Sequence, residues 1–221
     1  MRPHWWGILG LIGWAYLLCA LLYLFAGAKI WLIFPVWLIL LALNVHEFTG
    51  LPWKLPAIRL MVSASNHALV MSGVVASVFY KKLSDSGRIN LFISLLMILA
   101  AVSLLFGFAV RSEWGISKIR ATPSWTAICA GISFAFFAGM YWIADIRGNT
   151  HWATFMMPAG KSTLTCYLVP YIIYPTLGPL IMLIPDSLTG GIAGLIKALL
   201  FALLVVWITG RLEKINIRLK I

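Results

Sequence analysis

Acidic residues and cysteines are both scarce in this chain of 221 residues. Asp and Glu together number 6 and are scattered, so neither the paired carboxylates of a glycosidase nor a two-metal site is indicated. The three cysteines, Cys19, Cys129 and Cys166, all fall inside apolar runs. They show neither C-x-x-C spacing nor a Cys/His ligand pattern, which argues against a disulfide framework or a zinc site. We therefore expect no metal site.

Common catalytic and nucleotide-binding motifs are also missing. Gly160-Lys161-Ser162 resembles the end of a P-loop, but the pattern requires glycine at position 155, where the chain has Phe155. No buried strand precedes it. Neither G-x-S-x-G nor H-E-x-x-H occurs. The residues alone therefore identify no catalytic group.

Hydrophobic residues dominate what is present. They make up 62% of the chain, the mean hydropathy is +0.97, and there are 11 tryptophans, which indicates a polytopic membrane protein. The net charge of +11 would suggest nucleic acid as the partner of a soluble protein. Here most basic residues flank apolar runs, as membrane topology requires. We therefore expect membrane lipids, and no nucleic acid, as partners.

The apolar runs predict an all-α integral membrane protein with about seven transmembrane helices in a single membrane domain, residues 1–221. A bundle of six spans is the main alternative. The predicted spans are Trp5–Ala26, Ile30–Asn44, Val62–Tyr80, Ile89–Val110, Trp125–Ile146, Ser162–Ile184 and Gly191–Gly210. The second span contains Pro35, which predicts a kink or a tilt.

The distribution of Lys and Arg predicts the orientation. Ten lie in the first, third and fifth loops and the tail, and six lie in the N-terminus and the remaining loops. Because the side richer in Lys and Arg faces the cytoplasm, the N-terminus is expected outside and the C-terminus inside.

Two basic loops are thus predicted to meet at one cytoplasmic mouth. One carries Lys81, Lys82 and Arg88, and the other carries Arg147 and Lys161. The second is expected to be a polar loop that runs into a helix beginning at Ser162 or Thr163, whose free N–H groups can receive an anion. These cations could bind a phosphorylated cytosolic ligand, or serve only topology and lipid phosphates.

The third span begins with polar residues near its predicted external end. Asn66 and His67 are expensive in a membrane unless they find partners or line a wet cavity, so they are candidates for a substrate cavity or for an interhelical hydrogen bond. Ala68, Ser72 and Ala76 share one helical face and predict tight helix packing.

Several segments, in order and spacing, resemble one family, the transmembrane acyltransferases related to heparan-α-glucosaminide N-acetyltransferase, which includes bacterial homologues of unassigned function. The segments are Trp6–Tyr16, Ser65–Gly73, Ile116–Trp125, Ala144–Gly148, Pro158–Leu168 and the last apolar span with its basic tail. The similarity extends over nearly the whole chain, and no single motif within it is diagnostic.

The resemblance implies transfer of an acetyl group from cytosolic acetyl-CoA to an acceptor across the membrane, typically an amino sugar, in a bacterial inner membrane. It implies a CoA-phosphate site at Arg147 and Lys161, helped by Lys81 and Lys82. Family members have further spans before the matching region, and their active-site histidine lies there. The chain is therefore expected to be the C-terminal part of such an enzyme. It would be truncated or split, work with a separate N-terminal half or as a homo-oligomer, or have lost catalysis.

Two other classes of function remain open from the sequence. The chain could be a non-catalytic scaffold or assembly subunit, in which the cations serve topology only. It could also be a small-molecule or lipid transporter, in which Asn66, His67 and Lys197 would line the pathway.

Overall fold

The computed structural model describes residues 8–49, 64–181 and 190–216, and within these ranges the regular structure is helical, as predicted. The chain divides into two compact units, residues 1–147 (unit 1) and 148–221 (unit 2), and each is described by itself. The expected single membrane domain stays a prediction.

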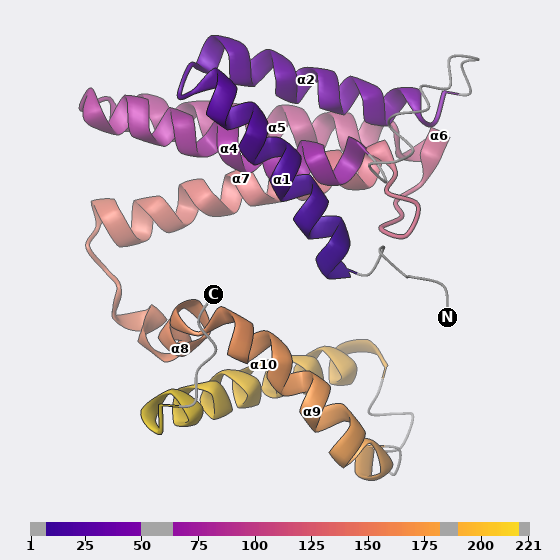
Figure 1. Cartoon of the computed structure of the whole chain (residues 1–221), viewed down its shortest axis with the longest axis vertical. Coiled ribbons are helices and arrows are strands. Elements are labelled where there is room, and N and C mark those ends of the chain that lie inside the picture. Colours follow the sequence, from indigo (N-terminus) through magenta and orange to yellow (C-terminus); the bar gives the residue numbers. More distant parts are fainter. Residues whose placement is uncertain (1–7, 50–63, 182–189, 217–221) are drawn as a thin grey trace. The chain divides into compact units, whose positions relative to one another are not determined.

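Unit 1 is a bundle of long helices, with short connections from α1 to α2 and from α4 to α5 (Figure 1). The connection from α1 to α2, the connection from α4 to α5 and the carboxyl end of α7 lie at one end of this bundle, and α6 lies at the other. Its described helices are α1 (Ile8–Ala26), α2 (Ile30–His46), α4 (Ala64–Asp85), α5 (Ile89–Ala109), α6 (Arg111–Trp114) and α7 (Pro123–Tyr141), with α7 followed by a π-helix, η1 (Trp142–Ile146).

Small residues let α5 and α7 approach closely. A Cβ atom added at Gly131 would lie 2.8 Å from Leu104 Cγ and 3.0 Å from the Ala100 carbonyl oxygen. One added at Gly107 would lie 3.0 Å from the Ser124 carbonyl oxygen. Membrane helices commonly associate through such glycines, because lipid supplies no hydrophobic drive between them.

Aromatic rings fill the rest of the core of unit 1. Phe92 is almost fully buried and packs edge-on against Tyr141, with ring centroids 5.3 Å apart. Trp37 meets Phe134 edge-on at 5.8 Å. Such contacts contribute about 0.5–1.5 kcal/mol beyond area burial. The predicted small-residue face of α4 is confirmed as a packing surface, since Ala68, Ser72 and Ala76 are buried.

Unit 2 consists of the 3-10 helix η2 (His151–Met156), the short α8 (Met157–Lys161), α9 (Thr163–Ile181) and α10 (Gly191–Lys214). α10 packs closely on α8, because a Cβ atom at Gly210 would lie 3.1 Å from Pro158 Cγ. α9 begins at Thr163, as predicted. The segment before it is helical over residues 151–161, so the expectation of a polar loop there was wrong.

The described helices agree with the predicted spans within a few residues, and the predicted ends at Trp5, Val62 and Ile184 lie outside the described residues. α2 continues through Pro35 to His46, and α4 extends to Asp85, beyond the predicted end at Tyr80. Among the described residues, three helices are long and apolar enough to cross a membrane: Ile89–Ala109, Pro123–Ile146 and Gly191–Lys214. Shorter apolar helices cover Gly10–Ala26 and Ile30–His46. The chain thus has membrane-spanning candidates, while the full count of seven remains a prediction.

Candidate functional site

A basic cavity lies in unit 2 and is called the basic pocket below. Its volume is about 860 Å³. One wall comes from η2 and α8, and the other from the last turns of α10. It is lined by Thr154, Phe155, Pro158, Lys161, Leu203, Val206, Trp207, Gly210, Arg211, Glu213 and Lys214.

Three cations converge on the basic pocket from residues about fifty positions apart. Lys161 ends α8, while Arg211 and Lys214 lie in the last turn of α10, and Glu213 is the acidic lining residue. The carboxyl end of a helix carries about half a negative elementary charge. The positive charge of the three cations is larger than the sum of this helix charge and the charge of the Glu213 carboxylate. The pocket is therefore electrostatically suited to a phosphorylated ligand.

Aromatic and apolar side chains give the pocket a second chemical character. The guanidinium of Arg211 lies 5.0 Å from the centroid of the Trp207 ring, a cation–π contact that also holds the Arg211 side chain against α10. Phe155 lies on the opposite wall. Both rings are partly exposed, Trp207 at 58% and Phe155 at 53%. The pocket can therefore offer flat apolar surface to a ring next to its cations.

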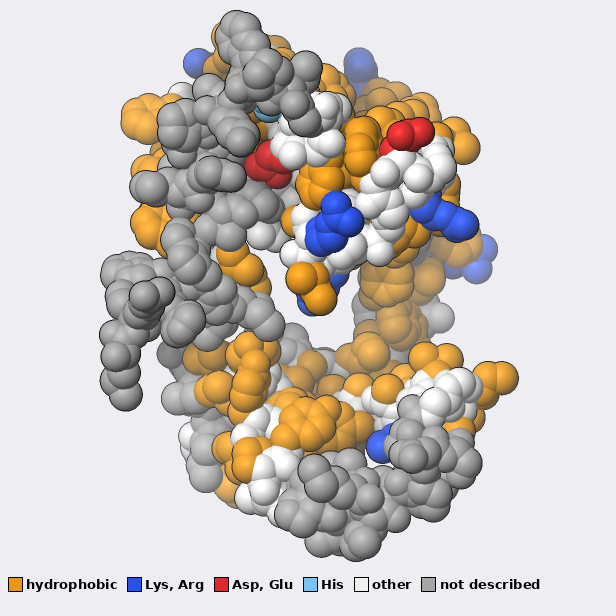
Figure 2. Space-filling model, turned by 90° about the vertical axis from the view of Figure 1, so that its right-hand side faces the viewer, with side chains coloured by type: hydrophobic (Ala, Val, Ile, Leu, Met, Phe, Trp, Pro, Cys, Tyr) orange, Lys and Arg blue, Asp and Glu red, His pale blue; other side chains and the backbone are white. Residues whose placement is uncertain are grey.

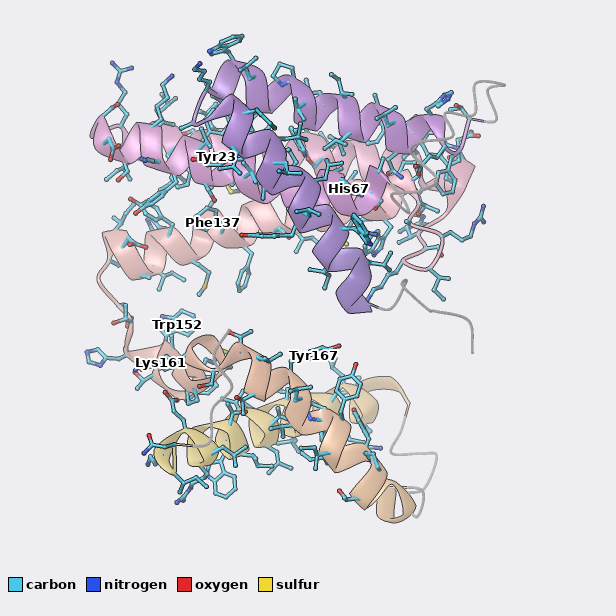
Figure 3. The ribbon with its side chains drawn as sticks, in the orientation of Figure 1. Tyr23, His67, Phe137, Trp152, Lys161 and Tyr167 are labelled. Atoms are coloured by element: carbon cyan, nitrogen blue, oxygen red, sulfur yellow. The ribbon has the colours of Figure 1, made fainter. Side chains whose placement is uncertain are left out.

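Local sequence determines where Lys161 lies. Pro158 is in the first turn of α8, where its fixed φ and missing N–H are compatible with a helix start. The N–H of Ser162 donates to the Pro158 carbonyl oxygen at 3.0 Å and closes the turn that carries Lys161. In Figure 3, Lys161 and Trp152 lie at the same end of unit 2, and Tyr167 lies further along α9.

The start of α9 follows a helical turn and not the expected loop, and its use as an anion site stays a prediction. A helical turn precedes Thr163, and the Ser162 N–H is already bonded to Pro158. The hydroxyl of Thr163 in turn donates to the Gly160 carbonyl oxygen at 3.1 Å. Next to this helix start, Lys161, Arg211 and Lys214 of the basic pocket add positive charge.

Lys81 and Lys82 lie together at one end of unit 1. Both are exposed in the last turns of α4, and with Lys29 and Asp85 they border a recess of about 350 Å³. Lys29 immediately precedes α2. The structure thus joins the two predicted lysines with a third from a different loop.

Arg147 is the last residue of unit 1 and follows the π-helix η1. Its guanidinium lies 3.9 Å from the centroid of the Trp142 ring, a close cation–π contact. Lys161 belongs to unit 2, so the predicted grouping of Arg147, Lys81 and Lys82 with Lys161 stays a prediction.

Asn66 and His67 lie in the first turn of α4, about 20 Å along the helix from Lys81 at 1.5 Å per residue. His67 is buried and Asn66 is partly buried. The Cys19 thiol of α1 donates to the His67 carbonyl oxygen at 3.4 Å. Figure 3 labels His67 on α4 and Tyr23 on α1. The predicted substrate residues and the predicted lysines therefore occupy opposite ends of one helix.

A buried polar network occupies the same end of unit 1 as His67. Ser65 and Thr126 hydroxyl oxygens are 2.6 Å apart, and the amide of Asn44 donates to the Ala121 carbonyl oxygen at 3.0 Å. The hydroxyls of Thr122 and Ser124 donate to the Gly115 carbonyl oxygen at 3.0 and 2.6 Å. Figure 2 views this end, where basic and acidic side chains gather among hydrophobic ones. The segment before α7 is thus fixed in place.

Sequence reasoning used Arg211 and Lys214 only as topology signals and did not single out Trp207. Positions 207, 210, 211 and 214 follow the i, i+3, i+4, i+7 spacing of one helical face. This pattern combines an aromatic residue, a glycine and two cations. It was a readable signal for a surface that packs and binds at once.

The described residues contain no group of three or more His, Cys, Asp or Glu positioned to hold a metal ion. No protein-family model, no curated protein and no solved structure matches the chain.

Proposed function

We propose that the chain is a membrane-embedded acyltransferase, or the C-terminal part of one, which takes acetyl groups from cytosolic acetyl-CoA. The acceptor would be an amino sugar or another glycan on the far side of the membrane. The resemblance of the segments from Trp6 to the basic tail supports this reaction. The basic pocket is the single structural observation that supports it most, because its cations and aromatic rings suit the phosphates and adenine of CoA.

In this proposal Lys161, Arg211 and Lys214 bind the phosphates, and the adenine lies against Trp207 or Phe155. Lys81, Lys82 and Arg147 of unit 1 are the further cations that the resemblance implies for the CoA phosphates. A topology of seven spans, with the N-terminus outside and the C-terminus inside, puts Lys161 and the tail on one side of the membrane. Their meeting in one pocket of unit 2 is compatible with that topology. The membrane would be a bacterial inner membrane.

The acceptor would bind near Asn66 and His67, at the other end of α4 from Lys81. Transfer to an amine or hydroxyl requires a base that removes its proton. We assign this base to no residue of the chain. It would come from a separate N-terminal half.

Binding of acetyl-CoA to the purified protein in nanodiscs tests the proposal directly. Hydrogen bonds to charged groups contribute about 1.5–3 kcal/mol, so Lys161→Glu should weaken binding roughly 10-fold to 100-fold in isothermal titration. Lys118→Glu reverses an exposed charge in unit 1, outside the basic pocket, and is the matched control.

We expect the control to bind acetyl-CoA as the unaltered chain does. Unchanged affinity of Lys161→Glu would contradict the assignment of Lys161. If the unaltered chain bound no acetyl-CoA, either alone or with a candidate N-terminal partner, the proposed function itself would fail.

A further inference from the structure

A groove runs along the surface of unit 1 between α1 and α4 and is called the α1–α4 groove below. Its volume is about 670 Å³. Residues between Tyr16 and Leu24 form its α1 wall, and residues between Val70 and Lys81 form its α4 wall. Its lining residues all belong to unit 1, whereas those of the basic pocket belong to unit 2.

The groove is apolar along most of its length. Ala20 and Leu24 face Val70, Val74 and Val78 across it. Gly73 leaves the groove open, because a Cβ atom at this position would find no atom within 4 Å. The Ser77 hydroxyl already donates to the Gly73 carbonyl oxygen at 2.8 Å. The lining thus suits a hydrocarbon chain better than a chain with amides, which would need hydrogen-bond partners.

One end of the groove is positively charged. Lys81 lines the groove and also borders the recess that Lys29 and Lys82 share. All three lysine side chains are exposed. A ligand that lies in the groove and reaches its charged end therefore meets cations from the last turns of α4 and from the connection between α1 and α2, with Asp85 as the acidic residue beside them. Phosphate is the complementary group.

The length of the groove matches one leaflet of a bilayer. From Val70 to Lys81, α4 rises about 16 Å at 1.5 Å per residue. Half of a hydrocarbon core about 30 Å thick is about 15 Å. The predicted orientation places the lysines on the cytoplasmic side, where lipids are anionic and attract Lys near the surface.

From the charge, the lining and the length together, we propose that unit 1 binds an anionic phospholipid of the cytoplasmic leaflet in the α1–α4 groove. The phosphate lies at Lys29 and Lys81, and one acyl chain lies along α4 past Gly73. The site does not depend on the acetyltransferase proposal, because the lipid binds without acetyl-CoA.

Photo-crosslinking in nanodiscs tests this site. The purified full chain is placed in phosphatidylcholine nanodiscs with a phosphatidylglycerol probe whose acyl chain carries a diazirine, or with the matching phosphatidylcholine probe. Mass spectrometry then locates the cross-links. We expect them in the groove walls on α1 and α4, with phosphatidylglycerol preferred.

Two kinds of variant distinguish the contribution of the lysine charges to lipid binding from that of the apolar groove. Removing Lys29 and Lys81 as Lys29→Gln with Lys81→Gln should reduce the preference for phosphatidylglycerol, by about fivefold for each lysine. Gly73→Leu fills the groove and should suppress its cross-links with both probes. Gly139→Leu is the matched control, because its Cβ also meets no atom within 4 Å and lies outside the groove on α7. Ser77→Leu, at another exposed groove position, repeats the test if Gly73→Leu does not fold.

Equal cross-linking by both probes, or unchanged cross-linking of folded Gly73→Leu and Ser77→Leu, would overturn the proposal. Displacement of the phosphatidylglycerol probe from the groove by acetyl-CoA would assign the groove to the cofactor and overturn it as well. A chain that binds no acetyl-CoA but cross-links phosphatidylglycerol in the groove would refute the proposed function and leave this inference intact.

Discussion

The hydroxyls of Thr122, Ser124 and Thr126 hold the start of α7 to the segment before it. Thr122 and Ser124 share the Gly115 carbonyl oxygen as acceptor, and Thr126 donates to the Thr122 carbonyl oxygen at 3.1 Å. All three side chains are fully buried. At membrane depth such groups are stable only when bonded, so each of them fixes a local geometry.

A single substitution measures the contribution of this network to the free energy of unfolding. Thr126→Val keeps the shape but leaves the buried Ser65 hydroxyl without its partner, which should cost about 1–3 kcal/mol of unfolding free energy. Ser65→Ala should cost less, because Thr126 keeps its bond to the Thr122 carbonyl oxygen. Urea or thermal unfolding in detergent provides the comparison.

The double variant is the internal control for this pair. With both partners replaced, no buried hydroxyl of the pair is left unbonded, so its stability should be equal to or above that of Thr126→Val. A double variant whose losses simply add would show that the two hydroxyls do not interact.

Sequence reasoning could identify Lys161 but not its neighbours in the basic pocket. Lys161 stood out because it follows a glycine and precedes a helix. Arg211 and Lys214 lie about fifty residues further on, and a basic tail has the same appearance whether it serves topology or a site. Only the packing of α10 on α8 brings the three cations together.

The α5–α7 pair shows how two elements of unit 1 are held at close distance. Their contact depends on glycines that leave the backbones room, chiefly Gly107 and Gly131. Apolar runs predicted both helices well, because each run is long and is bounded by charged or turn residues. The runs could not predict which helices pair, since the apolar residues of a span are alike on every side.

Matched glycine substitutions test the close packing. Gly131→Ala adds a Cβ atom 3.0 Å from a carbonyl oxygen and 2.8 Å from Leu104 Cγ, so overpacking should cost about 1–3 kcal/mol. Gly139→Ala on the same helix meets open space and should be neutral or gain up to about 1 kcal/mol of helix propensity. Thermal unfolding of both variants in one detergent gives the comparison. Equal melting temperatures would contradict the close approach.

The helices of residues 151–161 were missed because they are too short for hydrophobic periodicity to register. η2 has 6 residues and α8 has 5, which is about two turns and about one and a half turns. The hydrogen bonds that close α8, such as that from the Ser162 N–H to the Pro158 carbonyl oxygen, are local. They produce no hydrophobic periodicity that could be recognised in the sequence. The difference matters for the site, because Lys161 lies at the end of a helix and not in the predicted loop.

At the scale of the whole molecule, the chain consists of two helical units with a membrane composition. The predicted orientation depends on an excess of ten cations over six, and a change of one span would reverse it. The proposed binding of a cytosolic cofactor requires the segment between η1 and α8 to face the cytoplasm.

Cysteine accessibility in intact cells tests this orientation. In a background with Cys19, Cys129 and Cys166 replaced, Asn149→Cys should be protected from a membrane-impermeant maleimide until the cells are opened. Lys118→Cys, in the connection before α7, should react in intact cells. The reverse pattern would exclude access of cytosolic acetyl-CoA to the basic pocket.

The contact between Gly210 and Pro158 has a consequence for ligand selection. Arg211 and Lys214 belong to α10 and Lys161 belongs to α8, so the spacing of the charges is set by how near these two backbones come. Because Gly210 has no side chain, the two backbones can approach closely, and this distance determines the width of the basic pocket. In the proposed function, a larger residue at position 210 would hold the cations of α10 farther from Lys161 and would favour a ligand with more widely spaced charges.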